Sequence, residues 1–188
     1  MINKPFIKGA LLTVGLILLN QVVIQYWLYQ KQEDSRVINL AGRQRMLSQR
    51  LHAELIRSDT DETNKNLKLE LFTEWKKQHD ALLNGSDLFE INGITNDTIR
   101  AALQDVNMYI LTIEPYISVE HLTSAELRKV SNNQLAFLED MELIVDDLEK
   151  VSKVKLKTIV IIEILLAIIS VIVLLLEIRF IYQKVATD

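Results

Sequence analysis

The sequence predicts an all-α protein in which an antiparallel four-helix bundle is flanked by two transmembrane helices. Three observations predict this class. Apolar residues make up 49% of the 188 positions, and they gather at the two ends of the chain. Only 5 glycines and 2 prolines are present, which disfavours a turn-rich β fold. Between the ends, apolar residues recur at the spacing of one face of an α-helix.

The first apolar segment, residues 9–29, carries no formal charge and follows Lys4 and Lys8. About 20 apolar residues span the hydrocarbon core of a bilayer at about 1.5 Å per residue. A cleavable signal peptide is the alternative, because a basic start and an apolar run fit both. The run is longer than the apolar region of a signal peptide, and no Ala-x-Ala site follows it. We therefore expect an uncleaved anchor, preceded by residues 1–8.

The second apolar segment, residues 158–182, is rich in Ile, Leu and Val and predicts a second spanning helix, followed by residues 183–188. Glu163 lies about one and a half turns inside this span. It is either a functional intramembrane acid or a carboxylate near the headgroups that pairs with the lysines just before the span. Basic residues flank both spans, so the positive-inside rule does not choose the orientation. Two spans place both termini on the same side.

Residues 30–157 are predicted to form the bundle. The first helix continues from the first span, and its stripe ends at the polar residues 58–62, which offer N-cap candidates. A second helix is expected from about Thr63 to Leu83, where residues 84–86 break it. The expected core positions of these two helices are Val37, Leu40, Ala41, Gln44, Leu47, Leu51, Leu55, Leu67, Leu71, Trp75 and Leu82.

Two further helices are expected after the loop that contains Asn92. Asn96 is the predicted N-cap of a helix that ends near Pro115, and Thr123 with Glu126 has the spacing of a capping box for the last helix. Four such helices joined by short links make an antiparallel bundle. Their expected core positions are Ile99, Leu103, Val106, Ile110, Ile113, Leu127, Val130, Leu135, Leu138, Met141, Ile144, Val145 and Leu148.

The residues of the chain do not indicate an enzyme, a cofactor site or a metal site. Cysteine is absent, and His52, His79 and His121 stand at no metal-ligand spacing. No phosphate-binding loop, dinucleotide turn or nucleophile elbow is found. The net charge of -4 comes with no long basic arm, so nucleic acid is not an expected partner.

One segment, residues 38–51, is unusual because it carries three arginines and a glycine in mid-helix. Gly42 costs about 1 kcal/mol against Ala in a helix, which suggests that another helix or a ligand approaches closely. A solvated basic face with a tolerated glycine is the alternative. Arg45 and Arg50 lie about 140° apart around the helix axis, so one helix does not easily direct both at one ion. A two-fold dimer could place two copies of one arginine around a planar oxyanion or a carboxylate.

The same segment closely resembles the signature of the NarX/NarQ-type nitrate and nitrite sensors and of the PilJ-type chemotaxis transducer N-terminal domain. Their pattern is approximately Asn-x-Ala-Gly-x-x-Arg-Met-x-Ser-x-Arg at the start of a periplasmic bundle. The wording around the arginines is closer to the PilJ-like branch, and outside the motif the likeness is one of architecture. The matching residues, in register, are Asn39, Ala41, Gly42, Arg45, Met46, Ser48 and Arg50.

The resemblance implies a multi-pass protein of the bacterial inner membrane, with a periplasmic or extracellular bundle and cytoplasmic termini. It assigns to Arg50 the grip on a ligand from both subunits of a homodimer, and to Arg45 a structural or signalling role. Ala41 and Gly42 would allow helices to approach closely. Nitrate, nitrite or another oxyanion is the small anion that it suggests. The candidate ligand-binding residues are Arg50, Arg45, Gly42, Ala41, Arg43 and Met46.

We therefore expect a sensory input module that binds a small ligand and passes a helix shift of about one or two ångströms across the membrane. Members of the family usually continue into an output domain. We expect either that an output region was lost or that a separate signalling protein pairs with this one in the lipid membrane. The rival hypothesis is a structural or adaptor membrane protein whose bundle mediates protein–protein interaction without a small ligand.

Overall fold

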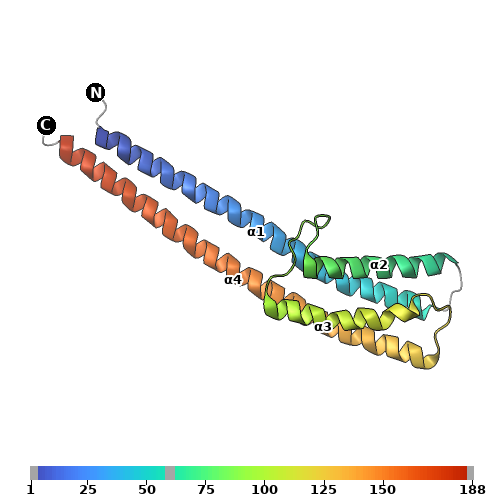
Figure 1. Cartoon of the computed structure of the whole chain (residues 1–188). Coiled ribbons are helices and arrows are strands. Elements are labelled where there is room, and N and C mark those ends of the chain that lie inside the picture. The colour runs from blue at the N-terminus through green and yellow to red at the C-terminus, as the bar shows by residue number, and fades with distance from the viewer. Residues whose placement is uncertain (1–3, 58–61, 186–188) are drawn as a thin grey trace. The chain divides into compact units, whose positions relative to one another are not determined.

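The computed structural model describes residues 4–57 and 62–185. Within these ranges the chain forms four α-helices and no strand, apart from one isolated β-bridge between Ser86 and Ile91 (Figure 1). The all-α class is confirmed. The elements are α1 (Lys4–Ile56), α2 (Glu62–Asn84), α3 (Asp97–Ile113), the 3-10 turn η1 (Glu114–Tyr116) and α4 (Ser124–Val185).

The described residues divide into two compact units, and α1 and α4 contribute to both. The first unit comprises the described parts of residues 1–32 and 152–188. Its two helix segments are apolar and mostly exposed, and the structure contains two helices that are long and apolar enough to cross a membrane. The boundaries 9–29 and 158–182 of the two spans stay a prediction.

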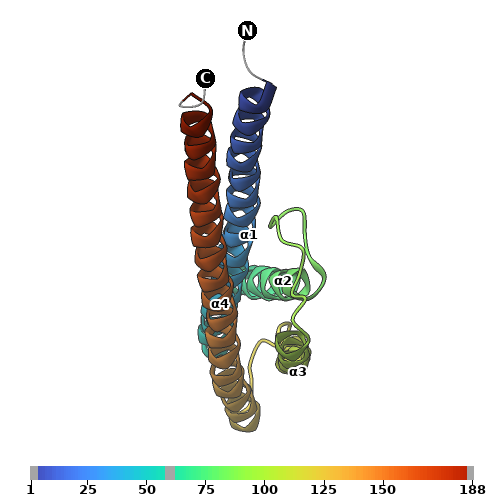
Figure 2. The same ribbon diagram turned by 90° about the vertical axis from the view of Figure 1, so that its left-hand side faces the viewer.

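The second unit, the described part of residues 33–151, is the helical bundle. Here α2 and α3 lie alongside the bundle segments of α1 and α4 (Figures 1 and 2). Its centre is aromatic. The rings of Trp75 in α2 and Phe137 in α4 meet edge to face at 4.8 Å between centroids, and both side chains are fully buried. Tyr109 of α3 reaches α4, where its hydroxyl donates to Asp140 at 2.7 Å.

The periodicity of the sequence predicts most of this core correctly. All seven expected positions of α1 and all five of α3 are buried, which confirms both stripes. The expectation for Leu135 is wrong, because its side chain is 66% exposed. The buried face of α4 runs through positions 130, 134, 137, 141, 144 and 148. A residue next to position 134 is turned by about 100° away from that face.

The predicted helix ends are also found. The Asn96 side chain accepts from the Ile99 backbone N–H at 3.1 Å and so caps α3. Thr123 and Glu126 form the reciprocal bonds of a capping box, with Thr123 N–H donating to Glu126 Oε2 at 2.8 Å. Pro115 lies in η1, directly after α3. Of the polar stretch 58–62, residues 58–61 lie outside the described part of the chain.

The link between α2 and α3, residues 85–96, is a compact loop in which Gly85 and Gly93 lie against each other. Gly85 and Gly93 both have positive φ, +85° and +80°. A Cβ atom on Gly93 would lie 2.7 Å from the Gly85 backbone nitrogen, so both glycines are required by close backbone contact. The Ile91 and Ile94 side chains of this link are buried in the core.

Candidate functional site

The unusual segment of α1 has two faces that the bundle treats differently. One face is buried against the other helices, and the other is open to solvent, as the 3.6-residue period of a helix requires. The predicted ligand residues are divided between these faces, and Arg45 lies half-buried at their edge. The buried face comprises Ala41, Gln44, Leu47, Ser48 and Leu51. The outward face comprises Asn39, Gly42, Arg43, Met46, Gln49, Arg50, Ala53 and Ile56.

Polar side chains on the buried face join α1 to α4. With its amide in the orientation that satisfies both ends, Gln134 of α4 donates to the Ser48 carbonyl at 3.1 Å and accepts from Ser48 Oγ at 3.2 Å. The Ser48 hydroxyl also lies 2.9 Å from the Arg45 carbonyl. The Gln44 amide is fully buried and has no hydrogen-bond partner among the described residues. Ser48 therefore has a structural role inside the bundle, and Ala41 is fully buried beside it on the same face.

Arg45 has a partner in its own chain. Its guanidinium Nη2 lies 2.5 Å from Glu142 Oε2 of α4, and the Arg45 side chain is about one third exposed. This ion pair ties α1 to α4 at the edge between the two faces. Arg45 is thus the member of the arginine group that the bundle itself engages, in line with the structural role that the resemblance implies.

Gly42 faces open space. No atom of the described residues lies within 4 Å of the position that a Cβ would take, other than its own helix backbone and chain neighbours. Packing within the described chain therefore does not require a glycine here, although glycine weakens a helix by about 1 kcal/mol against alanine. A helix or ligand that approaches from outside the bundle and a tolerated glycine on a solvated face both stay predictions.

Arg43 and Arg50 are exposed, and neither has a hydrogen bond or ion pair with any other described residue. They lie on the same side of α1, because seven residues make almost two full turns. Met46, between them, is 54% exposed. Four of the six predicted ligand residues therefore share the outward face.

A hollow of about 710 Å³ lies against this outward face. One of its walls is Phe89 of the α2–α3 link, and another is Val145 of α4. Arg50 is not among its lining residues. The lining consists of Arg36, Ile38, Asn39, Leu40, Gly42, Arg43, Met46, Phe89 and Val145.

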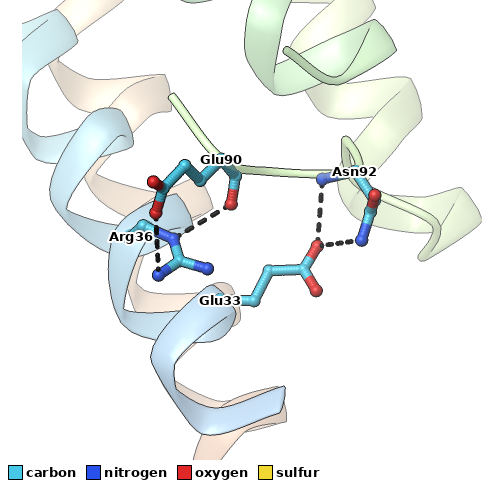
Figure 3. Close-up of polar contacts among 4 residues, drawn as sticks. All are labelled: Glu33, Arg36, Glu90 and Asn92. Atoms are coloured by element: carbon cyan, nitrogen blue, oxygen red, sulfur yellow. Dashed lines mark hydrogen bonds and ion pairs between the residues drawn. The ribbon is translucent and has the colours of Figure 1, made fainter. Parts of the chain in front are cut away.

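The α2–α3 link is held against α1 by a polar clamp (Figure 3). Arg36 Nε donates to the Glu90 carbonyl at 2.9 Å, and its Nη1 lies 3.5 Å from the Glu90 carboxylate. Glu33 Oε1 accepts from both the backbone and the side-chain nitrogen of Asn92, each at 3.0 Å. The clamp is not predicted from the sequence, since its partners lie 54 and 59 positions apart in the chain.

Most of the chain matches one known protein family. Residues 26–151, about two thirds of the chain, match PilJ, described as the type IV pili methyl-accepting chemotaxis transducer N-term. This chain belongs to the PilJ family. The matched range contains the whole second unit. No curated protein and no solved structure was found to match.

Membership of the PilJ family makes the chain an input module of signal transduction, and the family is non-catalytic. Together with the two helices that could span a bilayer, it indicates a protein of the inner membrane. The PilJ part of the resemblance is confirmed. The nitrate-sensor part, the ligand and the dimer stay predictions.

The histidines of this PilJ-family chain take separate positions. His79 of α2 is 2% exposed, and desolvation by burial lowers its pKa to about 4. The His52 ring lies 3.0 Å from the Ser131 hydroxyl, with a pKa lowered by burial, and His121 is exposed. Among the described residues no three His, Asp or Glu side chains are grouped to hold a metal ion.

A polar contact joins the two helices of the first unit. Thr13 Oγ1 of α1 donates to Glu177 Oε1 of α4 at 2.9 Å. A Cβ on Gly9 would lie 3.1 Å from the same carboxylate, so this glycine makes room for Glu177. The sequence analysis considered Glu163 but not Glu177. Glu163 is half-buried, and its two alternative roles stay open.

Proposed function

We propose that this PilJ-family chain is a homodimeric sensory input module whose two subunits meet along the outward face of α1. The observation that carries the proposal is the spacing of exposed residues on that face. Six exposed positions follow one another at alternating intervals of three and four, the repeat of a helix pair packed along a seam. They are Asn39, Gly42, Met46, Gln49, Ala53 and Ile56, which we call the α1 seam.

The composition of the α1 seam supports a second helix as its partner. Gly42 and Ala53 are small and would let two helix backbones approach, while Met46 and Ile56 offer apolar contact. If a second copy of α1 packs here, the close contact between subunits at Gly42 would offset the cost of a glycine within the helix. This is the close approach that the sequence analysis expected, transferred to the dimer.

A dimer along the α1 seam would bring two copies of Arg50 toward its axis. Two guanidinium groups repel each other unless an anion lies between them, and their planar donor pairs suit nitrate, nitrite or a carboxylate. Arg50 is exposed and has no partner among the described residues, so it is available for such a ligand. We propose nitrate or nitrite as the first anions to test.

The signal would travel along α1 and α4, because both helices contribute to both units. A ligand moves such helices only by the difference in its affinity for two arrangements of the dimer. Helix shifts of about 1–2 Å are common in switching proteins. The bundle would lie outside the cytoplasm, as the resemblance implies.

Cysteine cross-linking in membranes tests the dimer. The chain contains no cysteine, so a single introduced thiol can pair only with its copy in another subunit. We expect Ala53→Cys to form a disulfide-linked dimer under mild oxidation, and Leu69→Cys on α2, 56% exposed, to stay monomeric. Equal cross-linking of both variants would argue against the α1 seam.

Titration calorimetry on the full chain in lipid nanodiscs tests the ligand. We expect saturable binding of nitrate or nitrite at one ion per dimer, lost in Arg50→Ala and retained in Arg57→Ala. Arg57 is the matched control because it directly follows α1 and pairs with Glu54 of that helix. A dimer that binds neither ion would remove these oxyanions as ligands and favour the adaptor hypothesis.

A further inference from the structure

The hollow beside α1 is too large and too apolar for a bare oxyanion. We propose that it binds an organic carboxylate, with the carboxylate on Arg43 and the apolar body against Phe89 and Met46. The proposal rests on the proposed sensory function and names a ligand class for it. It differs from the oxyanion site in the residue that holds the charge.

The charges of the lining point to an anion. Arg36 and Arg43 are its ionisable residues, and none of the lining residues is acidic. Arg36 is already engaged by the carbonyl and carboxylate of Glu90. Arg43 has no partner among the described residues, so its guanidinium is the donor group that remains available. A guanidinium pairs best with a planar two-oxygen group such as a carboxylate.

The walls point to an apolar body on that anion. Five of the nine lining residues are apolar: Ile38, Leu40, Met46, Phe89 and Val145. The volume of about 710 Å³ falls within the range of about 300–1,000 Å³ that is typical of sites for small organic molecules. Phe89 offers a ring face or edge to an aromatic ligand, and Met46 is a flexible apolar neighbour.

The polar clamp fixes the aromatic wall before any ligand arrives. Phe89 directly precedes Glu90, which has a positive φ of 52°, an uncommon backbone state for this residue type. Arg36 and Glu33 hold Glu90 and Asn92 on either side of Ile91, whose side chain is buried. A wall that is already ordered costs little further entropy on binding.

Gly42 keeps the hollow open. It belongs to the lining, and the space above it is empty to 4 Å. A Cβ at this position would meet no described atom within 4 Å outside its own helix backbone and chain neighbours. Asn39, Gly42 and Met46 belong both to the hollow and to the α1 seam, so a ligand in the hollow and a second subunit packed on the seam would compete for the space above Gly42.

Calorimetric titration of the full chain in nanodiscs with benzoate, phenylacetate and hexanoate tests the proposal. Benzyl alcohol and benzylamine serve as neutral and cationic controls. We expect the carboxylates to bind and the controls not to bind. Arg43→Gln should weaken binding at least tenfold, which corresponds to about 1.4 kcal/mol. Arg57→Gln, outside the lining, should leave it unchanged.

Two more variants test the walls. Phe89→Ala should weaken phenylacetate binding by about tenfold, and Gly42→Leu should abolish it without lowering the melting temperature. Melting followed by circular dichroism shows whether each variant is folded.

The outcomes separate this proposal from the proposed function. Failure of all three carboxylates to bind, or binding that survives Arg43→Gln, would overturn the organic-carboxylate site. If no carboxylate binds while nitrate binds in a way that depends on Arg50 but not on Arg43, the organic-carboxylate site is overturned and the oxyanion sensor stands. Carboxylate binding to a chain that stays monomeric in the Ala53→Cys experiment would support the hollow and contradict the dimeric mode of sensing.

Discussion

The two faces of α1 in the bundle differ in what holds them. On the inward face, Leu47 and Leu51 are buried and Ser48 bonds to Gln134 of α4. On the outward face, the side chains of Arg43 and Arg50 have no hydrogen bond or ion pair with another described residue, and Gly42 faces open space. The same stretch of α1 therefore serves two separate purposes. Changes on the inward face should affect stability, and changes on the outward face should affect association and ligand binding.

The largest expected effect comes from the inward face. Leu51→Ala removes a fully buried side chain and should destabilise the bundle by about 3 kcal/mol, the usual cost of a core cavity. Met46→Ala is the outward control, and at 54% exposure it should cost no more than about 0.5 kcal/mol. Denaturant unfolding of both variants in detergent measures the difference. Equal losses of unfolding free energy in the two variants would show that the two faces do not differ in their contribution to stability.

The second-largest expected effect is a pH dependence of stability, for which we compare the buried His79 with the exposed His121. Burial lowers the pKa of His79 from 6.5 to about 4, so the unfolded chain takes up a proton at a higher pH than the folded one. Stability contributed by neutral His79 is complete above about pH 6.5 and falls as the pH drops toward 4. We expect a loss of about 2 kcal/mol between pH 7 and pH 4.5.

Unfolding free energies at the two pH values check this expectation. His79→Leu should reduce the pH dependence, whereas replacement of the exposed His121 by Gln should leave it as it is. An unchanged pH dependence in His79→Leu would show that other groups, such as the carboxylates, account for the acid sensitivity.

A smaller effect has the opposite sign. Gly42→Ala should stabilise the folded chain by about 1 kcal/mol, because alanine is the better helix former and the added methyl meets open space. The same change should reduce cross-linking of the Ala53→Cys variant, because the added methyl group would hold the two copies of α1 farther apart at the α1 seam. A destabilised variant would mean that the bundle itself needs the glycine.

The smallest effect lies at the edge between the faces. The Arg45–Glu142 ion pair is partly exposed, so its coupling energy should be about 0.5 kcal/mol. A double-mutant cycle with Arg45→Gln and Glu142→Gln measures it. A coupling above about 2 kcal/mol would show that this pair is better shielded from solvent than its exposure indicates.

The sequence could predict features that depend on near neighbours in the chain. The seven buried positions of α1 follow from helical periodicity, and the cap at Asn96 and the capping box at Thr123 follow from contacts three residues apart. The prediction for Leu135 is wrong because the buried face of α4 passes through position 134. That position is a glutamine, a polar residue that hydropathy alone does not place in a core. Phe137 was not predicted in the core because the expected stripe ran through positions 135 and 138, whereas the buried face runs through 134 and 137.

The site could be predicted only in part. The motif located the residues on one helix, but it did not show that the bundle engages Arg45 and leaves Arg43 and Arg50 free. The Glu142 partner lies 97 positions away, and the clamp of Glu33 on Asn92 spans 59. Such pairs depend on how the helices are brought together, which local spacing does not encode.

The contact between Thr13 and Glu177 limits how far the two helices of the first unit can slide. A displacement of about 1–2 Å stretches a single hydrogen bond, and side-chain rotation can follow it. A slip of one helical turn, about 5.4 Å, would take the carboxylate away from both its donor and the gap at Gly9. The Thr13–Glu177 pair thus permits a short displacement of the two helices and resists a change of their register.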